Sequence, residues 1–148
     1  MLLHGSCAAL EGEAVLFLAP PGGGKSDLLL RLIERGWRLV ADDQVALGVG
    51  PEVAMAAPPP ALAGMLEVRG LGLLTGLDWS AAPLRLVARL VARGDVPRLP
   101  SPESWSAEAV TLPLIHLDPW AASAPSRLAV ALRVLRGELR MAAGAFAA

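Results

Sequence analysis

The chain has 148 residues, of which 54% are apolar, which is enough for one domain with a buried core and too little for two. Thirteen basic residues nearly balance fourteen acidic ones, so the formal charge of -1 gives no sign of a nucleic-acid partner. No stretch approaches the roughly 18 consecutive apolar residues that a membrane-spanning helix needs. We therefore expect a single domain over residues 1–148, located in the cytoplasm, without membrane or nucleic-acid contacts.

The first predicted elements are two strands over residues 2–9 and 14–18. Both runs are apolar, and Gly12 in the acidic stretch between them is suited to the turn of a β-hairpin. The single cysteine, Cys7, lies in the first run and has no intramolecular partner. We expect it to be a small buried residue rather than a nucleophile.

A glycine-rich stretch follows the second strand and leads into a predicted helix. From Lys25 onward, apolar residues recur at helical spacing on one face. They are Leu28, Leu29, Leu32 and Ile33. Gly36 is placed to end this helix in the left-handed conformation. The glycine-rich stretch is therefore expected to join a strand to a helix N-terminus.

The next segments predict short strands and a loop. Residues 37–49 are mostly apolar and contain the adjacent pair Asp42 and Asp43, which predicts a strand interrupted by an acidic pair and continued by a second short strand. Residues 51–64 contain three consecutive prolines and predict a loop with room for one helical turn. Residues 65–76 predict one further short strand with glycines around it.

The last third of the chain predicts two strands and a helix. Residues 82–93 alternate between apolar residues and arginines, which favours a strand with one solvated face over a helix. Residues 94–106 predict a proline-rich loop, residues 109–118 a buried strand, and residues 123–142 a helix. This order predicts an α/β fold, bordering on α+β, with a mixed sheet flanked by helices.

The stretch FLAPPGGGKSD, residues 17–27, nearly matches the phosphate-binding pattern G-x-x-x-x-G-K-[ST]. Ala19 stands where the pattern has its first glycine, and the alternative is a glycine-rich turn without a ligand. The strand before and the helix after favour a P-loop, because helix N–H groups and the helix dipole then face the phosphates. The only lysine of the chain falls in this pattern, and its compact ammonium suits a tight phosphate pocket. The predicted nucleotide-binding residues are Ala19, Pro20, Pro21, Gly22, Gly23, Gly24, Lys25 and Ser26.

Acidic residues elsewhere could supply a metal ligand and a base for phosphoryl transfer. In a P-loop the hydroxyl of Ser26 would bind the Mg²⁺ of MgATP. Asp42 and Asp43 follow a strand and could divide the roles of metal anchor and proton acceptor, although such a pair alone is more often a turn. Glu67 and Arg69 are two residues apart, so a strand would point both to one side, toward metal and phosphoryl group respectively.

His4 is the remaining candidate near this chemistry. A histidine on an apolar strand is usually structural, but the predicted hairpin would bring His4 near the phosphates. There it could orient an aspartate by a hydrogen bond. His116 and the four tryptophans are expected to be structural.

Four motifs together resemble the HPr kinase/phosphorylase family over roughly half of the chain. They are HG at residues 4–5, the glycine loop, RGWRLVADDQV at residues 35–45 and EVRGLG at residues 67–72. The resemblance implies the C-terminal catalytic domain of an ATP-dependent protein serine kinase. It implies a P-loop fold related to phosphoenolpyruvate carboxykinase, with ATP and Mg²⁺ as cofactors. The substrate implied is a serine of HPr, the phosphocarrier of the sugar phosphotransferase system.

The resemblance also assigns roles to residues of this sequence. It implies that Asp43 is the general base with Asp42 and His4 beside it, that Lys25 and the loop hold the phosphates, and that Arg69 lies in a catalytic segment. Ser26 and Glu67 would hold Mg²⁺, and Arg98 is similar in placement to an active-site arginine.

Three departures from the family bear on what we expect. We expect the family's N-terminal domain to be lacking, since the sequence begins almost at His4; in addition, Ala19 replaces a glycine, and the segment associated with dephosphorylation has no counterpart. We therefore expect kinase activity, leave phosphorylase activity open, and treat a homo-oligomer as open as well. Two other functions fit the loop: a P-loop kinase of a small molecule, and an ATP-binding sensor without catalysis. The two aspartates and His4 argue against the sensor.

Overall fold

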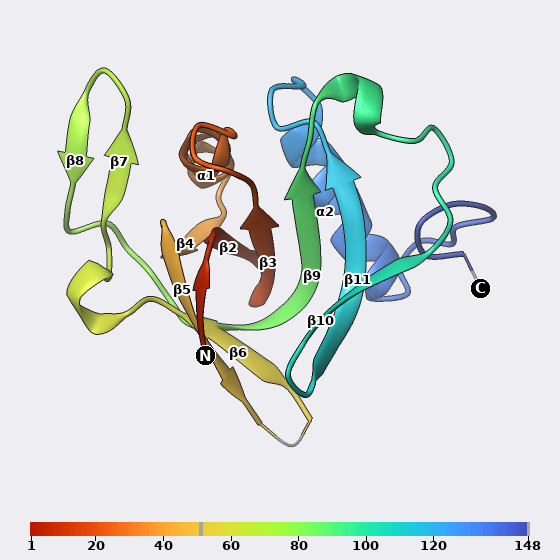
Figure 1. The fold of residues 1–148 in the computed structure, drawn as a ribbon, viewed down its shortest axis with the longest axis horizontal. Helices are drawn as coiled ribbons and strands as arrows, with labels where there is room; N and C mark the ends of the chain where they lie inside the picture. Colours follow the sequence, from red (N-terminus) through yellow and green to blue (C-terminus); the bar gives the residue numbers. More distant parts are fainter. Residues whose placement is uncertain (51, 148) are drawn as a thin grey trace.

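The computed structural model describes residues 1–50 and 52–147, and its main layer is a mixed sheet (Figure 1). Three parallel strands form the centre, in the order β3 (Glu13–Leu18), β9 (Ala82–Leu90) and β11 (Val110–Leu117). On the β3 side the layer continues antiparallel through β2 (Ser6–Leu10) to β4 (Arg38–Ala41). On the other side β10 (Glu103–Ala107) pairs antiparallel with β11. This mixed α/β arrangement confirms the predicted fold class at that level.

The sheet turns back on itself to form a second layer. β1 (Leu2–His4), β5 (Gln44–Val49) and β6 (Ala54–Ala57) pair antiparallel, and β6 joins the first residues of β9 through Met55 and Pro83. A separate hairpin consists of β7 (Leu66–Val68) and β8 (Gly72–Leu74). Two single 3-10 turns complete the connections, at Pro60–Leu62 and Arg93–Asp95.

Two helices cover the face of the main layer opposite the second layer. They are α1 (Lys25–Glu34) and α2 (Ala124–Leu135). Side chains of β3 alternate between the two faces: Val15 and Phe17 pack into the core with the helices, and Ala14 and Leu16 into the core with the second layer. β3, from which the glycine loop leaves, is therefore buried on both sides.

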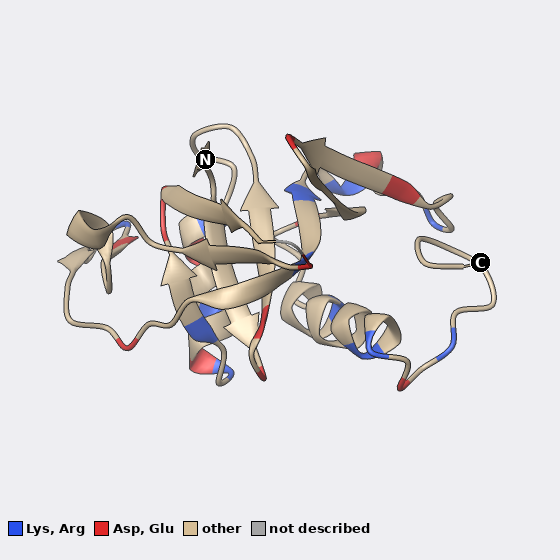
Figure 2. Ribbon diagram, turned by 90° about the horizontal axis from the view of Figure 1, so that it is seen from below, with Lys and Arg blue, Asp and Glu red and all other residues tan. Residues whose placement is uncertain are grey.

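Charged residues do not gather by sign on the side of the molecule seen in Figure 2. Figure 2 shows Lys and Arg residues interspersed with Asp and Glu residues over helices, strand ends and loops. Within residues 1–50 and 52–147, no helix is both long and apolar enough to cross a membrane.

Several predicted elements are confirmed. The hairpin is confirmed for β2 and β3, which turn at Glu11 and Gly12, whereas residues 2–4 of the predicted first strand form β1 and pair with β5. β4 and β5 are separated by the acidic pair. Gly36 ends the α1 region with φ of +90°, as expected of a left-handed terminus. The helical turn at Pro60–Leu62, the strands β9 and β11 and the helix α2 also lie within the predicted segments.

Other elements differ from the predictions because tertiary pairing overrides local sequence. β6 lies inside the predicted loop 51–64, and β10 begins inside the predicted loop 94–106. Residues 65–76 form a hairpin rather than one strand. β11 is half-buried rather than buried, since several of its residues keep partial exposure. α2 ends at Leu135, well before residue 142, because Gly137 adopts φ of +82° and closes the helix.

The predicted solvated face of residues 82–93 is also wrong. β9 lies in the middle of the main layer between the helices and the second layer, and Val87 on its supposed wet side is fully buried. Arg85 is only half-buried because it pairs with Glu13 of β3, with 3.0 Å between Arg85 Nε and Glu13 Oε2. On this side of β9, Arg85 is partly exposed and Arg89 is exposed, whereas Val87 between them is buried.

Phe17→Ala tests the packing beneath the glycine loop. Phe17 is fully buried between β3 and the helices, so its loss should lower the free energy of unfolding by about 3–5 kcal/mol. The measurement is urea unfolding followed by circular dichroism. Val130→Ala, at a residue of α2 that is 46% exposed, is the control and should change stability by less than about 0.5 kcal/mol. Equal effects of the two changes would contradict this core.

Candidate functional site

The loop between β3 and α1, residues 19–24, has a backbone that requires its glycines. Gly22 and Gly24 have φ of +78° and +92°, which residues with a Cβ rarely adopt. At Gly23 a Cβ would lie 2.6 Å from the Ala19 Cβ, so no side chain fits there. The first hydrogen bond inside α1 runs from Leu28 N–H to Gly24 O, which leaves the N–H groups before it directed out of the helix end. This is the backbone geometry of an anion site.

Ala19 fits this loop without a glycine conformation. Among the described residues other than glycine, positive φ occurs at Glu11, Asp43 and Glu108, and Ala19 is not one of them. Its carbonyl accepts a hydrogen bond from Lys25 Nζ at 2.7 Å. Lys25 is the first residue of α1 and only 9% exposed, so its ammonium is held over the loop. The departure from the glycine pattern therefore leaves the position of Lys25 unaffected.

Asp42 is a hydrogen-bond centre behind the loop. Its carboxylate accepts hydrogen bonds from the hydroxyls of Ser6 and Ser26, each at 2.9 Å, and from the backbone N–H of Glu67 at 3.4 Å. These partners belong to β2, α1 and β7. Asp42 thus lies behind the cavity wall rather than in it, where it fixes Ser26 and Glu67.

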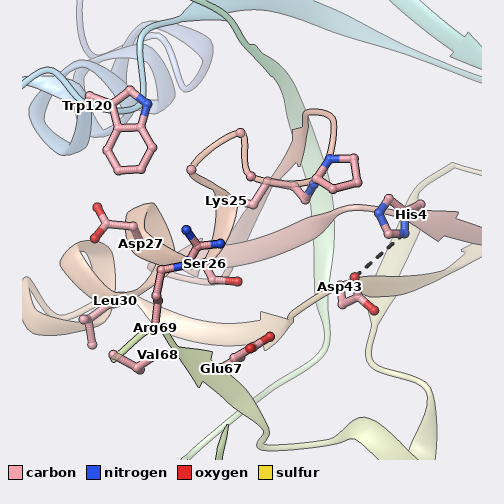
Figure 3. Close-up of a pocket in the computed structure, with 14 residues that line it drawn as sticks. His4, Lys25, Ser26, Asp27, Leu30, Asp43, Glu67, Val68, Arg69 and Trp120 are labelled. Carbon is pink, nitrogen blue, oxygen red and sulfur yellow. Dashed lines mark ion pairs between the residues drawn. The ribbon is translucent and has the colours of Figure 1, made fainter. Parts of the chain in front are cut away.

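Asp43 and His4 form a pair of side chains beside the loop. A distance of 3.8 Å separates His4 Nδ1 from Asp43 Oδ1 (Figure 3), and both side chains are more than half exposed. Asp43 has φ of +70°, and its backbone N–H donates to Ser6 Oγ at 3.3 Å. Gly5 separates β1 from β2 and packs against the backbone of Phe17, where a Cβ would lie 2.8 Å from the carbonyl oxygen. This break places His4 beside Asp43.

These groups line one cavity of about 550 Å³ (Figure 3). Of the predicted residues it is lined by Pro21, Gly22, Gly23, Gly24, Lys25, Ser26, His4, Asp43, Glu67 and Arg69. Ala19, Pro20 and Asp42 are not among its lining residues, and neither is Arg98, which lies in the segment between the turn Arg93–Asp95 and β10. Ser26, Glu67 and Arg69, which come from two distant segments, thus face the same space.

Four lining residues were not predicted from the sequence. They are Asp27, Leu30, Val68 and Trp120. Asp27 and Leu30 could have been found from the helical spacing that follows Lys25, since residues near the start of α1 must face the loop. Val68 lies between two predicted residues. Trp120 follows β11 and carries no sequence signal that points to this cavity.

The oxygen atoms around Ser26 fit a magnesium ion. Mg²⁺ prefers oxygen ligands and is commonly held by one or two carboxylates together with substrate phosphates and water. The Ser26 hydroxyl and the Glu67 carboxylate could serve as such ligands, and the contacts of Asp42 hold Ser26 and the Glu67 backbone near one another. Within the described part of the chain, no group of three or more His, Cys, Asp or Glu side chains gathers for a metal.

Cys7 and His116 lie away from this cavity. Burial raises the pKa of the Cys7 thiol, which keeps the group protonated and confirms a small buried residue. His116 of β11 lies across from β10, with 3.9 Å between its Nδ1 and Glu103 Oε1. Both residues therefore serve the sheet rather than the cavity.

Known proteins resemble this chain in sequence and in fold. HPr kinase/phosphorylases of Burkholderia cenocepacia strain HI2424, Burkholderia vietnamiensis strain G4 and Paraburkholderia phymatum are each 42% identical over 122 residues. Each alignment covers 76% of this chain and 38% of the relative, so the chain spans well under half the length of these relatives. The Hpr(Ser) kinase/phosphatase of Coxiella burnetii has the same fold, with a TM-score of 0.78 and 21% identity over 93% of this chain and 92% of that one.

The family of the HPr Serine kinase C-terminal domain matches residues 1–78, which is more than half of the chain. This range holds the glycine loop and Lys25 as well as His4, Asp43 and Glu67. Apart from Trp120, every residue that lines the cavity lies within it. The chain therefore belongs to the HPr serine kinase C-terminal domain family.

Proposed function

We propose that the chain is an ATP-dependent serine kinase that phosphorylates the phosphocarrier HPr. The observation that carries this proposal is the joint position of a phosphate-type loop and the Asp43–His4 pair on one cavity. A phosphate-binding loop without a base would bind nucleotide without transferring phosphate, and a carboxylate without such a loop would have no nucleotide to act on. Together they supply the two parts that phosphoryl transfer to a hydroxyl requires.

The glycine loop would act as a P-loop in a fold related to phosphoenolpyruvate carboxykinase. Its N–H groups and those at the start of α1 would hold the phosphates of ATP, and Lys25 would neutralise their charge. Lys25 has three N–H donors, of which one bonds Ala19 O at 2.7 Å and a second reaches Pro20 O at 3.5 Å, so one remains for a phosphate oxygen. Arg69 on the opposite wall adds a positive charge that can face the transferring group.

The metal site proposed here consists of Ser26 and Glu67, which line the cavity, with Asp42 behind them. When bound, Mg²⁺ would neutralise negative charge on the phosphate oxygens and so favour attack of a hydroxyl on the γ-phosphorus. Asp42 keeps the hydroxyl of Ser26 directed away from α1 through its 2.9 Å contact. The backbone contact from Glu67 sets where the Glu67 side chain leaves β7.

Asp43 is the proposed general base. The hydroxyl oxygen of the substrate serine bonds to the γ-phosphorus, its proton passes to the Asp43 carboxylate, and the bond from the γ-phosphorus to the ADP oxygen breaks. His4 lies 3.8 Å from Asp43 and can orient its carboxylate. Both side chains are exposed enough for a protein substrate to reach them. Asp43 is thus placed to take a proton from a hydroxyl that approaches from solvent.

The test of this function is transfer of phosphate from ATP to HPr. The purified chain is incubated with γ-labelled ATP, Mg²⁺ and HPr, and label on HPr is measured. Transfer to HPr that is lost when the target serine of HPr is replaced by alanine is expected. ATP binding without transfer would favour the sensor, and transfer to a small molecule instead of HPr would favour a small-molecule kinase.

Lys25→Ala tests the P-loop. Removal of the ammonium should weaken ATP binding at least tenfold and abolish transfer, because no other lysine is available to replace it. Isothermal titration calorimetry measures the affinity. Arg127→Ala, which removes an exposed cation of α2 outside the cavity, is the matched control and should bind ATP as the wild type does. A fully active Lys25→Ala variant would refute the assignment.

Asp43→Asn tests the general base. Asparagine tolerates the φ of +70° at this position, so the fold and ATP affinity should be retained. Asparagine cannot take up the proton, and kcat should therefore fall by about 10²–10⁴-fold. Asp95→Asn, in the exposed turn Arg93–Asp95, is the control. Unchanged turnover of Asp43→Asn would show that the base lies elsewhere.

A further inference from the structure

The cavity has two ends of different chemistry. His4 and Asp43 lie at one end in Figure 3, and Trp120, Leu30 and Val68 lie toward the other, with the start of α1 between them. The polar end accounts for the phosphates and the reacting hydroxyl. No role has yet been given to the Trp120 end, which combines the indole and two aliphatic side chains with the carboxylate of Asp27.

Trp120 is held firmly by its backbone although its side chain is 61% exposed. The backbone N–H of Trp120 donates to Asp118 Oδ1 at 3.0 Å, a contact within the turn between β11 and α2. Arg31 of α1 donates to the carbonyls of Pro119 and Ala121 on either side of the tryptophan. These hydrogen bonds join the turn to α1 and hold the backbone from which the exposed indole projects.

An ion pair with Asp27 within α1 also holds the Arg31 side chain. Arg31 Nε lies 2.9 Å from Asp27 Oδ2, one helical turn earlier. Asp27 itself lines the cavity. The helix that begins at the glycine loop therefore also positions the tryptophan, and the two parts of the cavity are built on one rigid element.

The indole lies directly beside the glycine loop. A Cβ on Gly24 would come within 3.0 Å of Pro119 Cγ and 3.1 Å of Trp120 Cζ2. The ring edge thus touches the residue that caps α1, next to the N–H groups proposed to hold phosphates. A ligand with its phosphates on the loop would have the rest of its length within reach of the ring.

We propose that Trp120 is the stacking platform for the nucleobase of ATP, an inference that rests on the proposed ATP binding. ATP is anionic at one end and aromatic at the other, which matches the two ends of this cavity. Aromatic side chains commonly hold bases by stacking. The volume of about 550 Å³ lies in the range of small-ligand sites.

The substrate protein is a less suitable occupant of this end. The serine of a protein substrate must reach Asp43 and His4, which lie at the opposite end of the cavity in Figure 3. ATP between the two ends would point its γ-phosphate toward that pair and its base toward Trp120. Leu30 and Val68 would then exclude water from the base.

The experiment compares two ligands that share phosphates but differ in the base. Isothermal titration calorimetry with MgATP and with magnesium tripolyphosphate is performed on the wild type, Trp120→Ala and Trp120→Phe. Trp120→Ala should weaken ATP binding about tenfold and leave tripolyphosphate binding unchanged, whereas Trp120→Phe should bind ATP nearly as the wild type does. Trp79→Ala removes another exposed tryptophan, one outside the cavity, and should change neither affinity.

The outcomes separate this inference from the proposed function. Unchanged ATP affinity of Trp120→Ala would overturn the platform, and so would an equal loss for both ligands, which would mean that Trp120 only supports the loop. If Trp120→Ala raised only the KM for HPr in the transfer assay and left ATP affinity unchanged, Trp120 would contact the protein substrate instead, and the inference would be overturned. If these results came with normal transfer to HPr by the wild type, the kinase proposal would stand. A wild type that bound neither ligand would refute both.

Discussion

The arrangement of the site depends on the hydrogen bonds that the Asp42 carboxylate accepts. Ser6, Ser26 and the backbone of Glu67 all donate to it, so one charged group joins β2, α1 and β7. Hydrogen bonds to a carboxylate are stronger than those between neutral groups. The same Ser6 hydroxyl receives the N–H of Asp43, so the position of the proposed base also depends on this centre. Asp42, which does not line the cavity, thus sets the positions of Ser26, Glu67 and Asp43, which do.

The parts of the site that the sequence predicts are those built from neighbouring residues. The glycines, Lys25 and Ser26 lie in one strand-loop-helix unit, where spacing alone fixes which groups face the loop. The acidic pair interrupts β4 and β5 for a local reason as well, since Asp43 adopts the positive φ that Asp tolerates. Glu67 and Arg69 were placed together by their two-residue spacing, and both line the cavity.

Features that depend on distant pairing could not be predicted in this way. The alanine-rich β6 has little intrinsic preference for a strand and forms one because β5 and the start of β9 offer hydrogen-bond partners. Arg85 reads as a solvent residue until Glu13 of β3 is placed beside it. Trp120 reaches the cavity only because Arg31 binds the carbonyls around it. In each case the deciding partner is remote in the chain.

The parallel run of β3, β9 and β11 bears on how such a protein can change. Parallel strands end at the same edge of a sheet, so the segments that follow these three strands emerge side by side. They are the glycine loop, the segment with Arg98, and the turn with Trp120. The glycine loop keeps the conformation that its glycines require. The other two segments can vary in length or sequence without a change to the strands beneath, so the edge can change its ligand preference while the core stays the same.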